Sequence, residues 1–319
     1  MANTHGRARA NSSYFVPPLW LIDEYIGLPR FGRVVANSVR NLDLPSGTDS
    51  INLPKVNTGT AVAAQGADAG AVNNQDLTDT FVNAPVKTLA GQQDIAMQLL
   101  DQSPISFDEI IFMDLQADYN VKMDLQVIAG NGVGGNAQGI LGTNSINTVT
   151  FTSGAPTAAL LYPLWVQSQS TIETNRNLPA TATFCTPAIW YWMASQLDSS
   201  NRPFVTTLTP QAFNPMALQT GDGGEGPAGV LNSGLYVLKD GNIPSNLGAG
   251  SNETRIITLR TSDLYLWEGS MRTRTLTEVL SGTLQVRVQI YNYFAFMANR
   301  LPKAITVMSG TGLIPAAGF

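Results

Sequence analysis

The stretch SFDEIIFMDLQADYNVKMDLQVIAG, residues 106–130, decides the fold because it holds the strongest helical pattern in the chain. Ser106 and Glu109 have the spacing of a capping box, in which two side chains satisfy free amides at a helix start. Gly130 is a natural stop. The sequence therefore predicts a helix over about residues 106–129. At about 1.5 Å per residue it would span roughly 36 Å, longer than the average helix of globular proteins.

The apolar side chains of this helix recur mostly every three or four positions, which indicates one apolar face. We expect that face to be formed by Phe107, Ile111, Leu115, Val121, Leu125 and Ile128. The remaining faces are assigned to the charged residues Asp108, Asp114, Asp118, Lys122 and Asp124.

Outside this helix the pattern alternates between short strands and two further helices. The helices are expected at about residues 158–175 and 187–197, the second with Thr186 as its cap and proline in its first turn. Residues 284–291 alternate strictly between apolar and polar, which predicts a half-buried strand. The expected strands are 51–56, 181–184, 236–238, 255–259, 264–268, 283–294 and 304–308. Helices among separated strands indicate the α+β class.

Residues 58–84 are rich in Ala, Gly, Asn, Gln and Thr and nearly free of large apolar groups. Such a segment cannot build a core of its own. Two interpretations stay open, a disordered linker and an extended hairpin that a neighbouring subunit stabilises. We favour the hairpin.

The composition excludes several classes of protein. Charged residues make up 13% of the chain, about half the usual share, which suits a surface that neighbours cover, although an ordinary enzyme with a neutral surface remains an alternative. The net charge of −5 argues against a dedicated nucleic-acid reader. One cysteine (Cys185) and one histidine (His5) exclude a Cys/His metal cluster and an internal disulfide. We therefore expect no metal and no cofactor.

The targeting signals of membrane and secreted proteins are missing from the pattern. No apolar run reaches the roughly 18 residues of a membrane helix, and the first apolar cluster, residues 14–22, is broken by prolines and does not read as a secretory signal. We expect synthesis in the cytoplasm.

A nucleotide-dependent enzyme is the competing hypothesis from another class. Gly130, Gly132 and Gly135 have the spacing G-x-G-x-x-G, but a dinucleotide site needs a strand before these glycines and a helix after them. Here they follow a helix. No serine stands in a G-x-S-x-G elbow, and the only histidine, His5, lies in the arm. No catalytic residue is therefore assigned, and the chain is not expected to be an enzyme.

Four stretches carry a resemblance to a known family: LAGQQDIAMQLLDQSPISFDEII (89–111), DLQVIAGNGVGGNAQGIL (124–141), TPAIWYWMASQLDSSNRPF (186–204), and the strand 283–294 followed by residues 303–309. In this order they resemble the major capsid proteins of tailed bacteriophages with the Hong Kong 97 fold. The resemblance implies an N-terminal arm (1–45), an extended loop or hairpin (46–88), a peripheral domain with the spine helix (89–141 and 281–319) and an axial domain (142–280).

The function implied by the resemblance is structural. Copies of the chain would assemble into pentamers and hexamers of an icosahedral shell, the virion capsid, around the double-stranded DNA genome of a tailed phage. Portal and scaffolding proteins, and a decoration protein, are implied as further partners, with no membrane. An encapsulin-type compartment, which shares the fold, is the alternative. Some family members crosslink a loop lysine to an asparagine of another subunit, which is doubtful here because residues 58–86 contain no lysine.

Two groups of charged residues are candidates for contacts of the shell. Up to residue 40, five arginines stand against two acidic residues, a local balance of +3. These arginines would contact DNA phosphates or acidic groups of an adjoining subunit, and they are Arg7, Arg9, Arg30, Arg33 and Arg40. The second group, expected to form ion pairs between subunits, is Glu268, Arg272 and Arg274.

Overall fold

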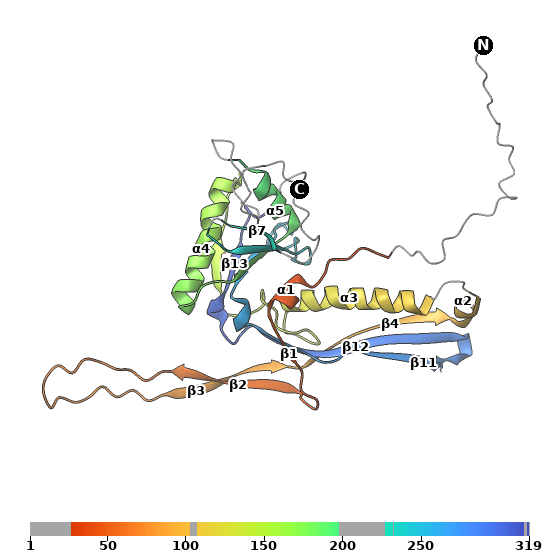
Figure 1. Ribbon diagram of the computed structural model, residues 1–319, viewed down its shortest axis with the longest axis horizontal. Coiled ribbons are helices and arrows are strands. Elements are labelled where there is room, and N and C mark those ends of the chain that lie inside the picture. The colour runs from red at the N-terminus through yellow and green to blue at the C-terminus, as the bar shows by residue number, and fades with distance from the viewer. Residues whose placement is uncertain (1–26, 103–106, 198–226, 232, 316–317, 319) are drawn as a thin grey trace, which may run out of the picture.

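The chain folds into two sheet-based units and a projecting hairpin (Figure 1). The computed structural model describes residues 27–102, 107–197, 227–231, 233–315 and 318. Helices are interspersed among separated strands, so the predicted α+β class is confirmed. Within these described residues, none of the helices combines the length and the apolar character needed to cross a membrane.

A five-stranded sheet and one long helix form the first unit. α3 (Phe107–Ala129) confirms the predicted helix, whereas its predicted cap, Ser106, lies outside the described residues. Gly91 and Ile290 mark the sheet face turned to α3, since a Cβ at Gly91 would lie 3.4 Å from Leu115 of the helix. The central strand β12 (Gln285–Met297) alternates between buried and half-buried positions over most of its length, as predicted. The other strands are β1 (Arg40–Asp43), β4 (Lys87–Ala96), β10 (Tyr265–Glu268) and β11 (Arg272–Leu280), and α2 (Met97–Gln102) follows β4.

The buried face of α3 differs from the predicted one. Met123 and Val127 are fully buried, whereas Val121 is only half-buried. Asp124, which was assigned to an outer face, is 0% exposed. The prediction was wrong here because a second element, the short helix α1 (Val34–Ser38), shares a core with the end of α3. The covered surface is therefore wider than one apolar stripe.

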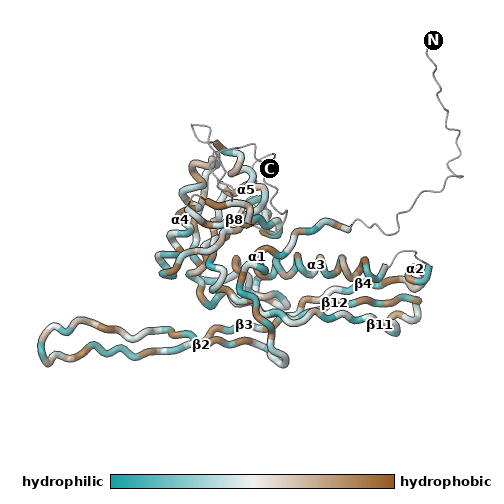
Figure 2. Tube along the Cα trace, in the orientation of Figure 1, coloured by the Kyte–Doolittle hydropathy of each residue, from teal (hydrophilic) through white to brown (hydrophobic). Residues whose placement is uncertain are grey.

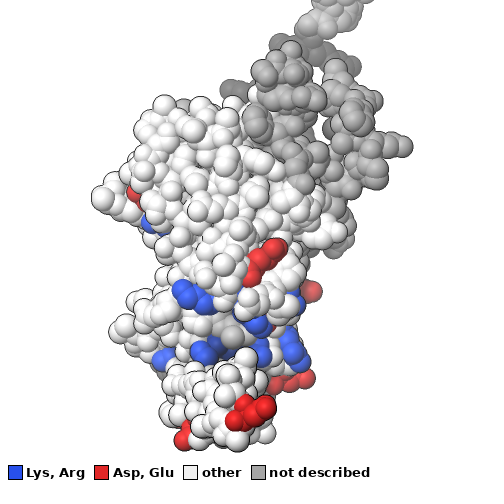
Figure 3. Space-filling view, turned by 90° about the vertical axis from the view of Figure 1, so that its left-hand side faces the viewer, with Lys and Arg blue, Asp and Glu red and all other residues white. Residues whose placement is uncertain are grey.

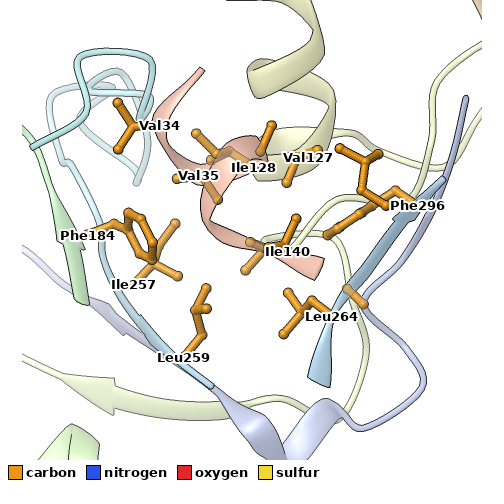
Figure 4. Close-up of a cluster of buried hydrophobic side chains, with 14 of the residues drawn as sticks. Val34, Val35, Val127, Ile128, Ile140, Phe184, Ile257, Leu259, Leu264 and Phe296 are labelled. Atoms are coloured by element: carbon orange, nitrogen blue, oxygen red, sulfur yellow. The ribbon is translucent and has the colours of Figure 1, made fainter. Parts of the chain in front are cut away.

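A six-stranded sheet with two helices forms the second unit. α4 (Ala158–Arg176) and α5 (Pro187–Ser195) pack on one face of this sheet around a core that includes Trp165 and Met193. The other face, with Phe184 and Ile257, packs against α1 and the end of α3 (Figure 4). The strands, in sheet order, are β5 (Asn147–Thr150), β13 (Ile305–Ser309), β9 (Ile256–Leu259), β6 (Ala182–Cys185), β8 (Tyr236–Lys239) and β7 (Pro227–Val230).

A buried hydroxyl network joins α4 to this sheet. The indole Nε1 of Trp165 donates to Thr183 Oγ1 at 2.9 Å, and Ser168 Oγ lies 2.8 Å from Thr258 Oγ1. The two threonine hydroxyls are 3.0 Å apart. At the start of α5, Thr186 occupies the predicted cap position, but its side chain makes no capping hydrogen bond.

The segment between the arm and the first unit is a hairpin, as predicted, while its stabilisation by a neighbouring subunit stays a prediction. β2 (Ser50–Thr58) and β3 (Thr78–Pro85) pair antiparallel, and residues 59–77 join their far ends (Figure 1). Side chains at the base, including Leu53 and Ala84, pack with Trp267 of the five-stranded sheet. The body therefore holds the hairpin at its base alone.

Sheet membership corrects the expected domain division. β13 was placed in the peripheral segment but pairs with β5 and β9 in the six-stranded sheet. β10 and β11 were placed in the axial segment but pair with β12 in the five-stranded sheet. The chain passes between the two sheets more than once, so no single uninterrupted range forms the axial unit. Two short 3-10 turns lie in these passages, η1 (Thr261–Asp263) and η3 (Pro302–Ala304), whereas η2 (Ser281–Thr283) joins β11 to β12 within the five-stranded sheet.

Candidate interaction surfaces

Two arginines of the arm fasten it to the body of its own chain. Arg30 donates to Asp114 at 2.9 Å and also to Asp118, both on α3. Arg33 makes a two-pronged contact with Glu268 of β10, with distances of 3.0 and 2.6 Å. Paired N–H groups of this kind form a strong and directional contact with a carboxylate. These arginines therefore have acidic partners without any neighbouring subunit.

The other arm arginines are placed differently. The guanidinium of Arg40 lies 5.1 Å from the centre of the Tyr265 ring and is exposed. Arg7 and Arg9 lie outside the described residues. A role of Arg40, Arg7 and Arg9 in contacting DNA or a neighbour stays a prediction.

Glu268 is the meeting point of the arm, α3 and the five-stranded sheet. Besides Arg33, its Oε1 accepts a hydrogen bond from the Tyr119 hydroxyl at 2.7 Å, and Asn292 donates to the same hydroxyl at 2.9 Å. Burial opposes the charged form of Glu268, but the hydrogen bonds from Arg33 and Tyr119 outweigh it and lower the pKa of this carboxyl. Burial, and then the bond to Glu268, raises the pKa of Tyr119. The ion pair of Glu268 in the structure is thus internal to the chain and differs from the expected pair between subunits.

We expect Glu268→Gln to lower the free energy of unfolding at neutral pH by about 1–3 kcal/mol, because the Arg33 guanidinium loses its charged partner. The pKa of Glu268 is depressed in the folded state, so its contribution is present above the ordinary glutamate pKa and is lost as pH falls through the depressed one. Urea unfolding at neutral and acidic pH should therefore show a difference between wild type and variant that shrinks toward acid. Glu278→Gln, an exposed glutamate of β11, is the control, and an equal loss in both variants would contradict the role of Glu268.

Arginines and tyrosines line the face of the five-stranded sheet that points away from α3. Strand residues alternate between faces, so Tyr291 and Tyr293 lie opposite to Ile290. The guanidinium of Arg272 lies 5.9 Å from the Tyr293 ring centre, and that of Arg274 lies 5.6 Å from the Tyr291 ring centre. Such stacking of a cation on a ring is weakly stabilising at an exposed site.

The charges of Arg272 and Arg274 are open to contact from another molecule. Both are exposed, and among the described residues neither guanidinium contacts a carboxylate. Arg287, on the same face, is paired with Asp94 at 2.7 Å. Ion pairs of Arg272 and Arg274 with another subunit therefore stay a prediction, with both side chains placed where a partner can reach them.

Exposed apolar side chains mark the hairpin. Val62 is 99% exposed and Phe81 is 69% exposed, and Figure 2 shows apolar positions along the hairpin far from the body. Large apolar groups gathered on a surface indicate a site of interaction with another protein. Lys55 lies in β2, so the hairpin does carry one lysine near its base, although residues 59–77 have none.

Charge is distributed unevenly over the surface. Seen from the side of the hairpin tip, most lysines, arginines and acidic residues lie in the lower half of the molecule, and the upper half that faces the viewer carries few (Figure 3). The upper half is the unit of the six-stranded sheet (Figure 1). Contacts made through that part of the surface would depend on shape and apolar area more than on ion pairs.

The glycine-rich segment after α3 is folded back on the helix end. The amides of Gly139 and Ile140 donate to the carbonyls of Gly130 and Val127, each at 2.8 Å. A Cβ at Gly130 would lie 2.3 Å from the carbonyl oxygen of Ala137. The glycines thus end a helix and permit a close turn. This segment does not form the strand, loop and helix that a dinucleotide site requires. The structure therefore gives no support to dinucleotide binding at these glycines.

The fold matches solved structures from tailed phages and from a GTA particle over nearly the whole chain. The chain matches a structure from Gordonia phage Cozz with TM-score 0.67 and 15% identity, over 93% of this chain and 92% of that one. It matches one from Microbacterium phage Oxtober96 with TM-score 0.69 and 13% identity, over 95% and 99%. The capsid of a native GTA particle matches with TM-score 0.69 and 14% identity, over 95% and 98%. The fold is the Hong Kong 97-like capsid fold.

The family follows from the sequence itself. The sequence profile of the phage capsid family matches residues 12–309, and the chain therefore belongs to this family. It is a major capsid protein, and the matches do not favour an encapsulin compartment. No curated protein matches the chain by sequence.

Proposed function

We propose that this major capsid protein assembles into pentamers and hexamers of an icosahedral shell that encloses the double-stranded DNA genome of a tailed phage. The observation that carries the proposal is the hairpin, which projects from the body, exposes Val62 and Phe81, and is held at its base alone. Apolar side chains exposed in this way gain free energy when a neighbouring copy covers them.

Many modest contacts of this kind would act together in a closed shell. Each subunit both gives a hairpin and receives one, and linked contacts strengthen each other because the later ones form at a high effective concentration. The exposed Arg272 and Arg274 supply further contacts between subunits, and Arg40 with Arg7 and Arg9 supplies contacts to DNA phosphates or to acidic groups of a neighbour.

The role proposed is structural, and no catalytic step is assigned to any residue. Synthesis in the host cytoplasm, guidance by a scaffolding protein and docking to a portal protein complete the proposal, with a decoration protein as a further partner. Covalent crosslinks through lysines of residues 59–77 are not part of it, since that segment has no lysine.

Electron microscopy of the purified protein, combined with nuclease treatment, tests the proposal. We expect closed icosahedral particles, and DNA that nuclease cannot reach when the particles come from infected cells. Particles that hold a cargo protein in place of DNA would favour the encapsulin alternative. A monomer that binds a dinucleotide in solution would overturn the proposal and support the enzyme hypothesis.

A further inference from the structure

Two buried aspartates meet at the joint between the arm, α3 and the six-stranded sheet. Asp124 of α3 is 0% exposed and Asp240, which directly follows β8, is 1% exposed. Aspartate is almost never fully buried unless it is paired. Both of these carboxyl groups accept a hydrogen bond from the same residue, Asn242, so the two buried acids lie next to each other in the joint. The hydrogen-bond partners and charges around the two carboxyl groups determine whether both can be ionised.

Asp124 holds the arm directly. Its Oδ1 accepts the amide of Ala36 in α1 at 2.8 Å, and its Oδ2 accepts the side-chain amide of Asn242 at 3.0 Å. The same Asn242 amide donates to the carbonyl of Gly32 at 2.8 Å. Three elements are thus tied together through one carboxylate, and two of the bonds end on the arm.

Asp240 completes the joint from the side of the six-stranded sheet. Its Oδ1 accepts the backbone amide of Asn242 at 2.8 Å. Its Oδ2 is buried and makes no hydrogen bond of normal geometry with the described residues, and the backbone amide of Val35 in α1 interacts with the same carboxyl group. The contact with the Asp124 carboxylate becomes a hydrogen bond only when a proton sits between the two groups, because two ionised carboxylates cannot donate.

The cations near this pair, among the residues that the structure describes, are already engaged by other groups. The positive group that interacts with Asp124 is Arg33, which is bound to Glu268. Lys239 precedes Asp240 in the chain, but its ammonium donates to the hydroxyl of Tyr191 at 2.8 Å.

The other groups near the joint leave no unpaired positive charge among the described residues. The Tyr119 hydroxyl donates to Glu268, and the Cys185 thiol is buried, which raises its pKa. On the arm, Arg30 is held by Asp114 and Asp118. Like charges in a buried pair are relieved by retaining one proton, as in carboxyl dyads of other proteins.

We propose that Asp124 and Asp240 share one proton, and that this shared proton fastens residues 32–36 of the arm to the body, so that the arm is held more weakly as pH rises. The element that yields is the arm, because α1 has only five residues and so short an element can open locally without unfolding of the sheets. This pH-dependent attachment of the arm does not require assembly, so it can be measured on the unassembled chain.

The sign of the pH dependence follows from the direction of the shift. Burial, and then the contact with Asp124, raises the pKa of Asp240 from its ordinary 3.8 to about 9. The stabilising effect of the proton is fully present below the ordinary value and is lost as pH rises toward the raised one. Between the two values the equilibrium for opening the joint increases by about tenfold per pH unit.

Hydrogen exchange of a peptide that covers residues 33–39 measures this opening. For the wild-type full-length chain, we expect protection of the Ala36 amide, corrected for the intrinsic exchange rate, to fall by about tenfold per pH unit and to level off near the raised pKa. Asp240→Asn places a permanent amide donor against Asp124, so protection should stay constant with pH. Asp101→Asn, an exposed aspartate of α2, should follow wild type.

A pH-independent protection in wild type, or the same slope in Asp240→Asn, would overturn the shared proton. If Asp240→Asn does not fold, infrared spectroscopy of the wild type decides the question. A carboxylic acid band at neutral pH that disappears on raising the pH supports the proposal, and its absence at neutral pH refutes it.

Discussion

Replacing residues 59–77 by an Asn-Gly turn is expected to leave a folded subunit that forms no closed shells. Thr58 and Thr78 are register partners, so a two-residue turn can join β2 to β3 directly. The base of the hairpin, with Leu53 and Ala84, is untouched, and the free energy of unfolding should therefore change little. Sedimentation and electron microscopy would report subunits or small oligomers in place of particles.

A matched variant separates length from apolar contact. Val62→Thr combined with Val72→Thr keeps the full loop and removes two exposed apolar groups, and we expect it to assemble more weakly than wild type yet to form some shells. Circular dichroism of each unassembled chain controls for folding. Normal particles from the shortened chain would show that the hairpin has another role.

Trp165→Ala is expected to lower the free energy of unfolding by about 3–5 kcal/mol, the largest effect of any single substitution considered. The Trp165 side chain is fully buried between α4 and the six-stranded sheet, and its loss also removes the donor to Thr183. A cavity and an altered hydroxyl network would remain. Urea unfolding of unassembled subunits measures the change.

Leu160→Ala is the control for this prediction. It lies on the same helix but is 51% exposed, so its effect should stay below about 0.5 kcal/mol. Equal losses in the two variants would show that the helix surface, rather than the core around Trp165, limits stability.

The elements that could be predicted from the sequence are those with a strong local pattern. α3 and β12 were found because their apolar residues repeat over many positions. β4 was missed because its sequence, KTLAGQQDIA, is polar and gains its strand structure from pairing with β12 about 200 residues further along the chain. The domain limits were misplaced for the same reason, since distant pairings decide which sheet a strand joins.

The candidate sites show a similar limit. The excess of arginine in the arm was visible in the sequence, but the partners of Arg30 and Arg33 lie 84 or more positions away and had no local signal. Asp124 was overlooked, although it lies three residues after Val121 and four before Ile128. An acidic residue at that spacing on an apolar stripe is a usable sign of a buried carboxylate.

The free edges of the hairpin have a consequence for how the sequence can evolve. β2 and β3 pair with each other and with no other described strand, so each presents a row of main-chain donors and acceptors along its outer side. Every residue except proline supplies these groups alike. A ribbon that adheres through its main chain can replace most of its side chains while the mode of attachment persists, which agrees with capsid structures that share this architecture at 15% identity or less.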